Sequence, residues 1–550
     1  MIKNKFSVKG KIVDLFNRVI YSGEVFVEDG IIVKINKIAN APNQYILPGF
    51  VDSHVHVESS ALIPAHFAEM IVPRGTIAVI SDPHEIANVL GQKGIEFMIE
   101  NAKTTPLKFF FGAPSCVPAT NFETAGTVLD AEQVKKLLHD KDIFYLSEMM
   151  NYPGVIFDDP EVKAKIEAAL KSKKKIDGHA PGLSGENLKK YANAGITTDH
   201  ECSTLEEAIE KIKLGMKIQI REGSAAKNFH NLAPLFENYP DSLMLCTDDC
   251  HPDEIETEGH IDKIIQMGLK LNIDIFDLLR AASVIPIQHY NLPVGLCREV
   301  DKADFIVVKD LIKFKVLKSF IDGKLCYDIQ KGNLFKATKV KPLNNFRNSK
   351  IELSQLQIQL PENKTKIKVI EVIKDELITS KFLWQPAVKN DRIVETDLKN
   401  DILKIVVLNR YEEVKPTVGF IKNFGLKQGA LASSVAHDSH NIVAVGTDDT
   451  SITKAINLLI QTKGGICAVD DSSCEILELP VAGLMSLNKG EEVAIQYKKI
   501  NEKAHEMGTN LKAPFMTMAF MPLLVIPKLK ISDKGLFDVE KFEITSLFTE

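Results

Sequence analysis

The central part of the chain alternates short apolar runs with amphipathic stretches of helical length. Apolar runs favour buried strands, and an apolar repeat of three to four residues favours helices. Eight strand-then-helix units over about 240 residues are typical of a (β/α)8, TIM-like barrel, here residues 48–290. The predicted strands are residues 51–56, 77–81, 109–112, 144–147, 175–177, 196–199, 217–221 and 243–246. The predicted helices include residues 62–73, 85–102, 160–173, 184–194, 204–214 and 260–270.

The segments on either side of this barrel have a different pattern. Residues 6–47 form short alternating stretches with a turn signal at Asp29-Gly30, and a similar piece with an Asp322-Gly323 turn lies downstream. We therefore expect residues 1–47 and 291–340 to form one discontinuous small β-sandwich domain. Residues 341–365 have the composition of a linker, and residues 366–550 are expected to form a C-terminal α/β domain.

Composition and charge exclude several classes of function. The 550 residues are 45% hydrophobic and 25% charged with a net charge of -6, so neither nucleic-acid nor membrane binding is expected. We find no signal-peptide pattern at the N-terminus and no apolar run of membrane-spanning length. The eight cysteines form no C-x-x-C pair, which fits a cytoplasmic protein with packed thiols.

Polar residues follow nearly every predicted barrel strand, where barrel enzymes place their chemistry. The first is His54-Val55-His56, whose imidazoles would share one face of a strand end. An isolated His-x-His is more often a solvated pair than a metal site. The other strand ends are Asp82-Pro83-His84-Glu85, Glu148, Asp177-Gly178-His179, Asp199-His200-Glu201, Arg221-Glu222-Gly223-Ser224 and Thr247-Asp248-Asp249.

Together these strand ends supply enough ligands for two divalent ions that share one carboxylate. Imidazole and carboxylate suit zinc, manganese or ferrous iron, and such ions lower the pKa of bound water to about 7. Each histidine also has a plainer explanation: His179 as a helix cap or loop residue, and His200 as a surface residue. Their joint placement on successive strand ends favours the metal site.

Longer motifs resemble one family, the adenine deaminases of the amidohydrolase superfamily, of the bacterial and archaeal metal-dependent type. The His-x-His motif alone indicates only the superfamily. The Asp-Pro-His-Glu and Ala-His-Asp-Ser-His-Asn motifs narrow the resemblance to the adenine deaminases. The matching segments are residues 47–60, 82–91, 177–185, 199–202, 220–224, 247–249 and 435–441.

The resemblance implies a ligand set and an activity. The implied ligands are His54, His56, His179, His200 and Asp248, with Glu148 as the bridging carboxylate in place of the carbamylated lysine of other superfamily members. Two ions per chain are implied, Mn(II) or Fe(II) first and zinc as the further option. The family hydrolyses adenine to hypoxanthine and ammonia, and a homo-oligomer, a dimer, is expected.

The implied mechanism assigns roles to further residues. A hydroxide held between the two ions attacks C6 of adenine, and Asp248 accepts its proton and helps pass one to the departing amine. A ring nitrogen must also be protonated, for which Glu85, Glu222 and His84 are unranked candidates. Arg221, Glu222 and Ser224 are candidates to contact the purine edge, although a structural ion pair explains Arg221 and Glu222 equally well.

The C-terminal part has its own polar motif, residues 436–441, in which His437 and His440 are spaced to face one side of a turn. One explanation is a hydrogen-bonded turn that holds the domain together. The other is a loop that closes over the barrel mouth and contacts the substrate. The sequence departs from the family nearby, since Asn409-Arg410-Tyr411 stands where Glu-Arg-His is usual.

Three competing hypotheses differ in what they predict. Another deaminase or cyclic amidohydrolase of the same superfamily, acting on a different heterocycle, would share the ligand set. A zinc nucleobase deaminase needs a P-C-x-x-C motif, which the chain lacks. A scaffold protein on a decayed barrel is disfavoured because ligand-type residues stand at the expected strand ends.

Overall fold

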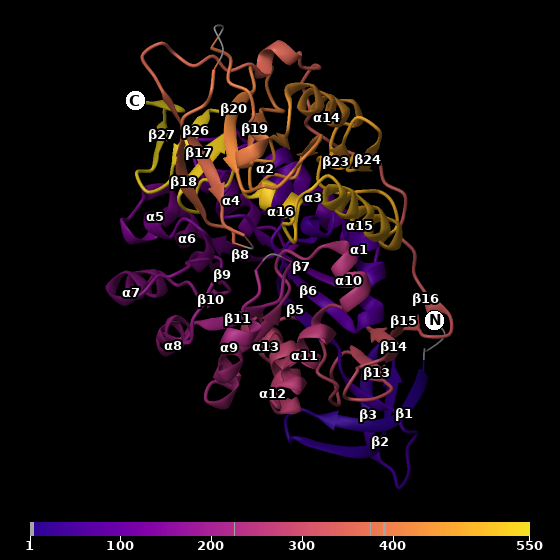
Figure 1. The fold of residues 1–550 in the computed structure, drawn as a ribbon. Helices are drawn as coiled ribbons and strands as arrows, with labels where there is room; N and C mark the ends of the chain where they lie inside the picture. Colours follow the sequence, from indigo (N-terminus) through magenta and orange to yellow (C-terminus); the bar gives the residue numbers. More distant parts are fainter. Residues whose placement is uncertain (1–4, 225, 375, 389–391) are drawn as a thin grey trace. The chain divides into compact units, whose positions relative to one another are not determined.

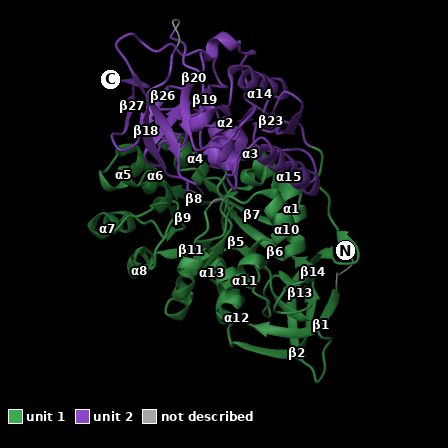
Figure 2. Ribbon diagram, in the orientation of Figure 1, with its two compact units in different colours: residues 1–83, 96–116, 130–339 green, residues 84–95, 117–129, 340–550 purple. Residues whose placement is uncertain are grey.

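The computed structural model describes residues 5–224, 226–374, 376–388 and 392–550. The chain divides into two compact units, which Figure 2 shows in separate colours and which we describe one at a time. The first unit comprises Met1–Pro83, Glu96–Cys116 and Asp130–Lys339. The second comprises His84–Ile95, Val117–Leu129 and Val340–Glu550.

Eight parallel strands form a closed barrel in the first unit (Figure 1). They pair in chain order within two sheets, β5 to β9 and β10 to β12. A parallel bridge between Ile176 and Ile196 joins the two sheets, and a second between Val55 and Asp248 closes the ring. The strands are β5 (Phe50–Val55), β6 (Thr76–Ser81), β7 (Lys108–Ala113), β8 (Ile143–Met149), β9 (Lys175–Gly178), β10 (Thr198–Asp199), β11 (Lys217–Arg221) and β12 (Leu243–Cys246). The predicted barrel is thus confirmed.

Helices follow the barrel strands, as the amphipathic pattern predicts. Their apolar sides are buried, and α6 packs against β8 and β9 while α8 packs against β11. They are α1 (Pro64–Ile71), α3 (Gln92–Ala102), α4 (Ala131–Leu138), α5 (Tyr152–Ile156), α6 (Pro160–Lys171), α7 (Gly185–Asn193), α8 (Leu205–Lys213), α9 (Phe229–Leu232), α10 (Pro252–Glu258), α11 (Ile261–Lys270), α12 (Ile275–Leu279) and α13 (Ile285–Tyr290).

The prediction of a single helix over residues 85–102 is wrong in one respect. The structure has two helices here, α2 (His84–Leu90) and α3, because Gly91 between them adopts a left-handed φ of 61°. A glycine takes this conformation without steric cost, so it can end a helix and turn the chain.

Strands from both flanks of the barrel combine in one mixed sheet of the first unit. Its order is β16-β15-β14-β13-β4-β1-β2-β3, with β4 lying between the N-terminal strand β1 and the downstream strand β13. The strands are β1 (Lys5–Asp14), β2 (Val19–Glu28), β3 (Ile31–Lys37), β4 (Tyr45–Pro48), β13 (Phe305–Val308), β14 (Val316–Ile321), β15 (Lys324–Asp328) and β16 (Gly332–Asn333).

The second unit is built on a nine-stranded sheet of order β18-β17-β20-β19-β22-β21-β23-β24, with β28 beside β17. Helix α14 (Asp449–Thr462) packs its apolar side on β21, β22 and β23. The sheet strands are β17 (Lys366–Val372), β18 (Thr379–Trp384), β19 (Ile402–Leu408), β20 (Thr417–Lys422), β21 (Ala430–Ser433), β22 (Ile442–Gly446), β23 (Gly465–Val469), β24 (Cys474–Glu478) and β28 (Phe548–Thr549). The other elements are α15 (Gly490–Glu506), α16 (Pro514–Ala519), β25 (Leu529–Ser532), β26 (Gly535–Asp538) and β27 (Glu543–Thr545).

Two further expectations concern the thiols and the membrane. All eight cysteines are free, and seven of them are buried. Across the part of the chain that the structure describes, no helix combines the length and the apolar character needed to cross a membrane.

Candidate functional site

Six side chains meet at the carboxyl ends of the barrel strands. They come from β5, β8 and the residues just after β5, β9, β10 and β12, where each buried strand ends. Parallel strands direct their carboxyl ends to one rim, so residues distant in sequence become neighbours. The six are the predicted ligands His54, His56, Glu148, His179, His200 and Asp248, of which all but the half-buried His179 are fully buried.

His54, His56 and Asp248 form one side of this cluster. The two Nε2 atoms lie 3.2 Å apart. Oδ1 of Asp248 lies 3.3 Å from Nε2 of His56 and 3.6 Å from Nε2 of His54. Asp248 has a φ of 57°, a left-handed conformation that costs a non-glycine residue free energy. The Nε2 atoms of both histidines and a carboxylate oxygen therefore face one place.

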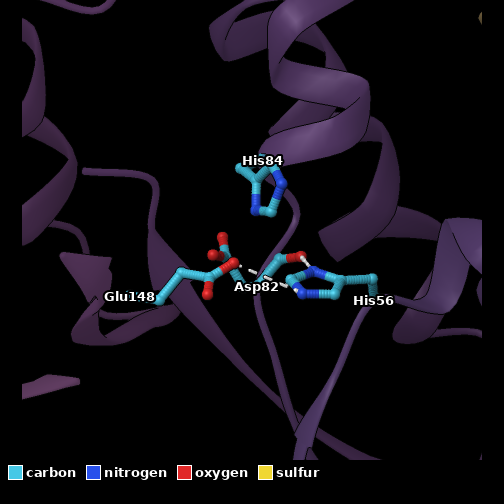
Figure 3. Close-up of side chains that lie close together, drawn as sticks. All are labelled: His56, Asp82, His84 and Glu148. Atoms are coloured by element: carbon cyan, nitrogen blue, oxygen red, sulfur yellow. Dashed lines mark hydrogen bonds and ion pairs between the residues drawn. The ribbon is translucent and has the colours of Figure 1, made fainter. Parts of the chain in front are cut away.

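Glu148 presents its two oxygens to different histidines. Oε1 lies 3.4 Å from Nε2 of His56. Oε2 lies 2.7 Å from Nδ1 of His179 and 3.2 Å from Nε2 of His200. Figure 3 shows His56 between the Glu148 carboxylate and the backbone carbonyl of Asp82. One carboxylate thus stands between two sets of imidazole nitrogens.

The Asp82 carbonyl also determines which nitrogen of His56 carries the proton in the neutral ring. It lies 3.1 Å from Nδ1, which must donate because a carbonyl oxygen only accepts. The neutral ring then has its lone pair on Nε2, the atom that faces Glu148 and Asp248. A hydrogen bond of this kind is the usual support for a histidine that binds a metal.

Burial and neighbouring charges shift the acidities of this cluster. Burial by itself would raise the pKa of Glu148, but His179 and His200 hold it well below the usual value. Burial would likewise raise the pKa of Asp248, which Arg221 and His56 keep well below normal. Burial, with His200 and His56, lowers the pKa of His54 well below its usual value. The carboxylates are therefore ionised, as metal ligands must be.

Arg221 forms ion pairs with two carboxylates of the barrel rim. Its guanidinium contacts Glu201 at 2.5 and 3.0 Å and Oδ2 of Asp248 at 2.6 Å. Glu201 in turn lies 3.6 Å from Nδ1 of His179 and 3.5 Å from Nε2 of His200. Arg221 thus fixes a ligand-type carboxylate on each side of itself.

Glu222 and Ser224 contact the segments that follow β11 and β12. Glu222 accepts a hydrogen bond from the Phe229 amide at 3.2 Å, and burial raises its pKa. The Ser224 hydroxyl accepts from the His251 amide at 2.8 Å. Its own amide donates to the Asp249 carbonyl at 2.7 Å.

His84, Glu85, His437 and His440 lie in the second unit. Oε1 of Glu85 lies 2.8 Å from Nδ1 of His437 and 3.6 Å from Nε2 of His84, and Oε2 contacts Nε2 of His440. Burial would raise the pKa of Glu85, but these histidines hold it well below its usual value. Both histidines of the C-terminal motif thus reach one carboxylate.

The turn that carries these histidines is itself fixed by hydrogen bonds. The His440 amide donates to the Ala436 carbonyl at 2.7 Å. The Tyr411 hydroxyl donates to the Ser439 carbonyl at 2.6 Å. Tyr411 therefore supports the backbone of this motif.

Sequence reasoning missed Glu201 as a site residue. It stands directly after His200, and that position was its only signal. Its approach to His179 and Arg221 depends on the barrel bringing three strand ends together. The close grouping of His179, His200 and Glu201 makes it a further possible metal ligand.

The cluster contains groups of side chains that could hold a divalent metal ion. His54, His56 and Asp248 form one group whose ligand atoms all lie within 4.8 Å, and His54, Glu148 and His200 form another. The Nε2 pair of His54 and His56 and the divided contacts of Glu148 are the features of donors around cations.

Comparison with known proteins identifies the family over nearly the whole length of the chain. The amidohydrolase family matches residues 45–326, and the adenine deaminase C-terminal domain matches residues 376–543. An adenine deaminase of Methanosarcina acetivorans is 54% identical over 98% of this chain and 99% of its own. Those of Methanosarcina barkeri and Borreliella afzelii are 53% and 48% identical, each over 98% of this chain and 99% of its own. The chain therefore belongs to the adenine deaminases of the amidohydrolase family.

Proposed function

We propose that this protein hydrolyses adenine to hypoxanthine and ammonia. The observation that carries the proposal is the Glu148 carboxylate, whose two oxygens face separate histidines in a chain 54% identical to an adenine deaminase over nearly its full length. The reaction replaces the exocyclic amine at C6 by oxygen, so it needs an activated water, a base and a proton for the leaving group.

The six-residue cluster would hold two divalent ions, Mn(II) or Fe(II) before zinc. Glu148 would be the ligand shared by both ions, since His56 lies at one of its oxygens and His179 and His200 lie at the other. Such ions supply a hydroxide nucleophile at neutral pH, because they lower the pKa of water to about 7. The protein's part is to fix the donors and keep the two carboxylates deprotonated. Neighbouring His179, His200 and Arg221 support this by holding the pKa of Glu148 and of Asp248 low against the effect of burial.

Asp248 is the proposed base. Its Oδ1 faces the His54 and His56 nitrogens, while Oδ2 is held by Arg221 at 2.6 Å. The guanidinium stabilises the ionised carboxylate and fixes its orientation, so Asp248 can accept the proton of the attacking water and pass it to the departing amine. General acid–base transfer of this kind contributes about 10²–10⁴ in rate.

Two of the three candidate donors to the purine ring, Glu222 and Glu85, have pKa shifts in opposite directions. Burial raises the pKa of Glu222, which makes this carboxyl the better suited of the two to carry and donate a proton. The histidines around Glu85 keep it ionised, so it is suited to accept a hydrogen bond from an N–H of the base. We therefore propose Glu222 as the ring donor and Glu85 as an acceptor, with His84 supporting Glu85.

Arg221, Ser224, His437 and His440 are the proposed substrate contacts. Arg221 also holds Asp248, and His437 and His440 also hold Glu85, so these three contacts would lie beside proposed catalytic carboxylates. We further propose a cytoplasmic homodimer. The proposed layout is a discontinuous β-sandwich from residues 1–47 and 291–340, a barrel from 48–290, a linker from 341–365 and a C-terminal domain from 366–550.

The experiment that tests this function follows adenine turning into hypoxanthine. The metal-free protein is loaded with Mn(II) or Fe(II), and ammonia release is measured with adenosine, guanine and cytosine as control substrates. We expect ammonia from adenine alone. The second candidate substrate is a different heterocycle, because the ligand set is common to hydrolases of this family. Ammonia from guanine or cytosine, and none from adenine, would favour this alternative.

A further inference from the structure

Helix α8 buries a lysine beneath two ligand-bearing strand ends. Lys211 lies on the last turn of the helix, and its side chain is 0% exposed. A buried ammonium group is costly unless every proton finds an acceptor and a carboxylate balances the charge. The burial of Lys211 must therefore be offset by specific contacts of its ammonium group.

Lys211 satisfies that requirement with three acceptors. Its Nζ donates to the Ala180 carbonyl at 2.8 Å and to Oε1 of Glu207 at 2.8 Å. Oδ1 of Asp199 lies 3.1 Å away and is also fully buried. An ammonium group has three protons, so each has one partner.

These partners connect two neighbouring loops of the barrel rim. Ala180 directly follows His179, and Asp199 directly precedes His200. Oδ2 of Asp199 accepts the Ala180 amide at 2.9 Å, and its Oδ1 accepts the Glu201 amide at 2.8 Å. Both backbone polar groups of Ala180 are thus held by the same buried ion pair.

A tyrosine on the preceding helix makes a similar connection. The hydroxyl of Tyr191 in α7 donates to the Met149 carbonyl at 2.8 Å and accepts the His179 amide at 3.0 Å. Met149 directly follows Glu148. The three strand ends that carry Glu148, His179 and His200 are therefore linked in series by buried polar groups of the outer helices.

We propose that Lys211 is a positioning residue for the metal ligands His179 and His200, acting through Asp199 and Ala180. The proposal rests on the ligand set of the proposed function. Without the ammonium group, the Ala180 carbonyl keeps only the longer hydrogen bond from the Leu183 amide, at 3.3 Å, and Asp199 loses its lysine counterion. The two histidines then lose their fixed spacing. Loss of such a supporting residue typically weakens metal binding about 10–100-fold.

A buried lysine in the second unit provides a matched control. The side chain of Lys404 is 2% exposed, and its Nζ contacts Asp449 at 2.6 Å and the Leu356 carbonyl at 3.2 Å. It lies on β19, whose neighbours are β20 and β22. Replacing it removes a buried ion pair of the same kind from a different part of the fold.

The test compares Lys211→Met with Lys404→Met. Each metal-free protein is titrated with Mn(II) against a chelating dye, and the bound metal is counted by elemental analysis, with thermal unfolding measured in parallel. We expect Lys211→Met to bind metal about 10–100-fold more weakly than wild type. Lys404→Met should lose stability yet keep the wild-type metal affinity.

Several results would overturn the proposal. Wild-type affinity in Lys211→Met would show that the lysine positions nothing, and an equal loss in Lys404→Met would show a general effect of instability. If Lys211→Met does not fold, Asp199→Asn/Lys211→Met, which also removes the fully buried charge of Asp199, takes its place in the same titration. A wild-type protein that binds no metal would instead refute the ligand set of the proposed function, and this proposal with it.

Discussion

Replacing Glu148 by glutamine is the sharpest test of the bridging carboxylate. The two side chains have the same shape, but the amide offers one oxygen where the carboxylate offers two. In the structure Oε1 lies 3.4 Å from His56, and Oε2 lies 2.7 Å from His179 and 3.2 Å from His200. One of the two histidine groups must therefore face an NH₂ group, which cannot bind a cation.

The expected magnitude follows from that loss. Removing a residue that only supports a ligand already costs about 10–100-fold in affinity. Losing a ligand oxygen should weaken metal binding by at least about 100-fold. This is about 3 kcal/mol of binding free energy at the weaker site, since each tenfold change is about 1.4 kcal/mol. We therefore expect Glu148→Gln to retain about one metal per chain where wild type retains about two, and to lose at least about 100-fold in the rate of adenine deamination.

The assay is metal content by elemental analysis after dialysis against a weak chelator, together with the rate of ammonia release. Glu69→Gln is the matched control, because Glu69 also contacts a histidine, His66, at 2.8 Å but lies outside the cluster. The control should keep two ions. Two tightly bound ions and full activity in Glu148→Gln would refute the bridging assignment.

Three further predictions concern other residues. Lys530 is fully buried and donates to the Leu377 and Phe520 carbonyls, and burial lowers the pKa of its amine from 10.5 to about 7. Between pH 7 and 10.5 the unfolded chain therefore binds a proton that the folded chain does not. The free energy of unfolding rises with pH over that window. Lys530→Met should therefore raise the free energy of unfolding at pH 7 by at most about 4 kcal/mol in urea titrations, a gain that fades towards pH 10.5; a constant difference across this range would contradict the assignment. Asp248→Asn should lower kcat for adenine by about 10²–10⁴, and a variant with near wild-type kcat would exclude Asp248 as the base. Glu222→Gln should lower kcat by at least about 10², whereas Glu85→Gln should chiefly raise KM. The reverse pattern in steady-state kinetics would make Glu85 the proton donor and Glu222 the hydrogen-bond acceptor.

Much of the barrel could be predicted from the sequence because its signals are local. Each buried strand is a short apolar run, and the run ends where a polar residue begins, as at Ser81-Asp82 and Cys246-Thr247. The six ligand candidates stand at those ends, so the strand pattern alone brings them to one rim.

The remaining features depend on contacts between distant residues. The ion pairs of Arg221 with Glu201 and Asp248 join three strand ends, and local patterning carries no signal for such pairing. Lys211 has the sequence context of an ordinary exposed helix lysine, yet it is fully buried. The break at Gly91 was missed because one glycine inside an amphipathic pattern is compatible with a continuous helix as well as with its end.

The division into compact units likewise has no local signal. Residues 84–95 and 117–129 group with the chain after residue 340, although their sequence continues the rhythm of the barrel. The contact of Glu85 with His437 spans more than three hundred residues and belongs to this grouping. Such packing is decided by the tertiary fold, which periodicity does not encode.

The most direct test of the central claim is one titration of activity against bound metal. The metal-free protein is loaded with increasing Mn(II), and ammonia release from adenine is measured at each metal content. We predict that deamination rises as the metal content rises and reaches its maximum at about two ions per chain, the number that six ligands with one bridging carboxylate can hold. Full activity at one ion per chain, or no ammonia from adenine at two, would contradict the account.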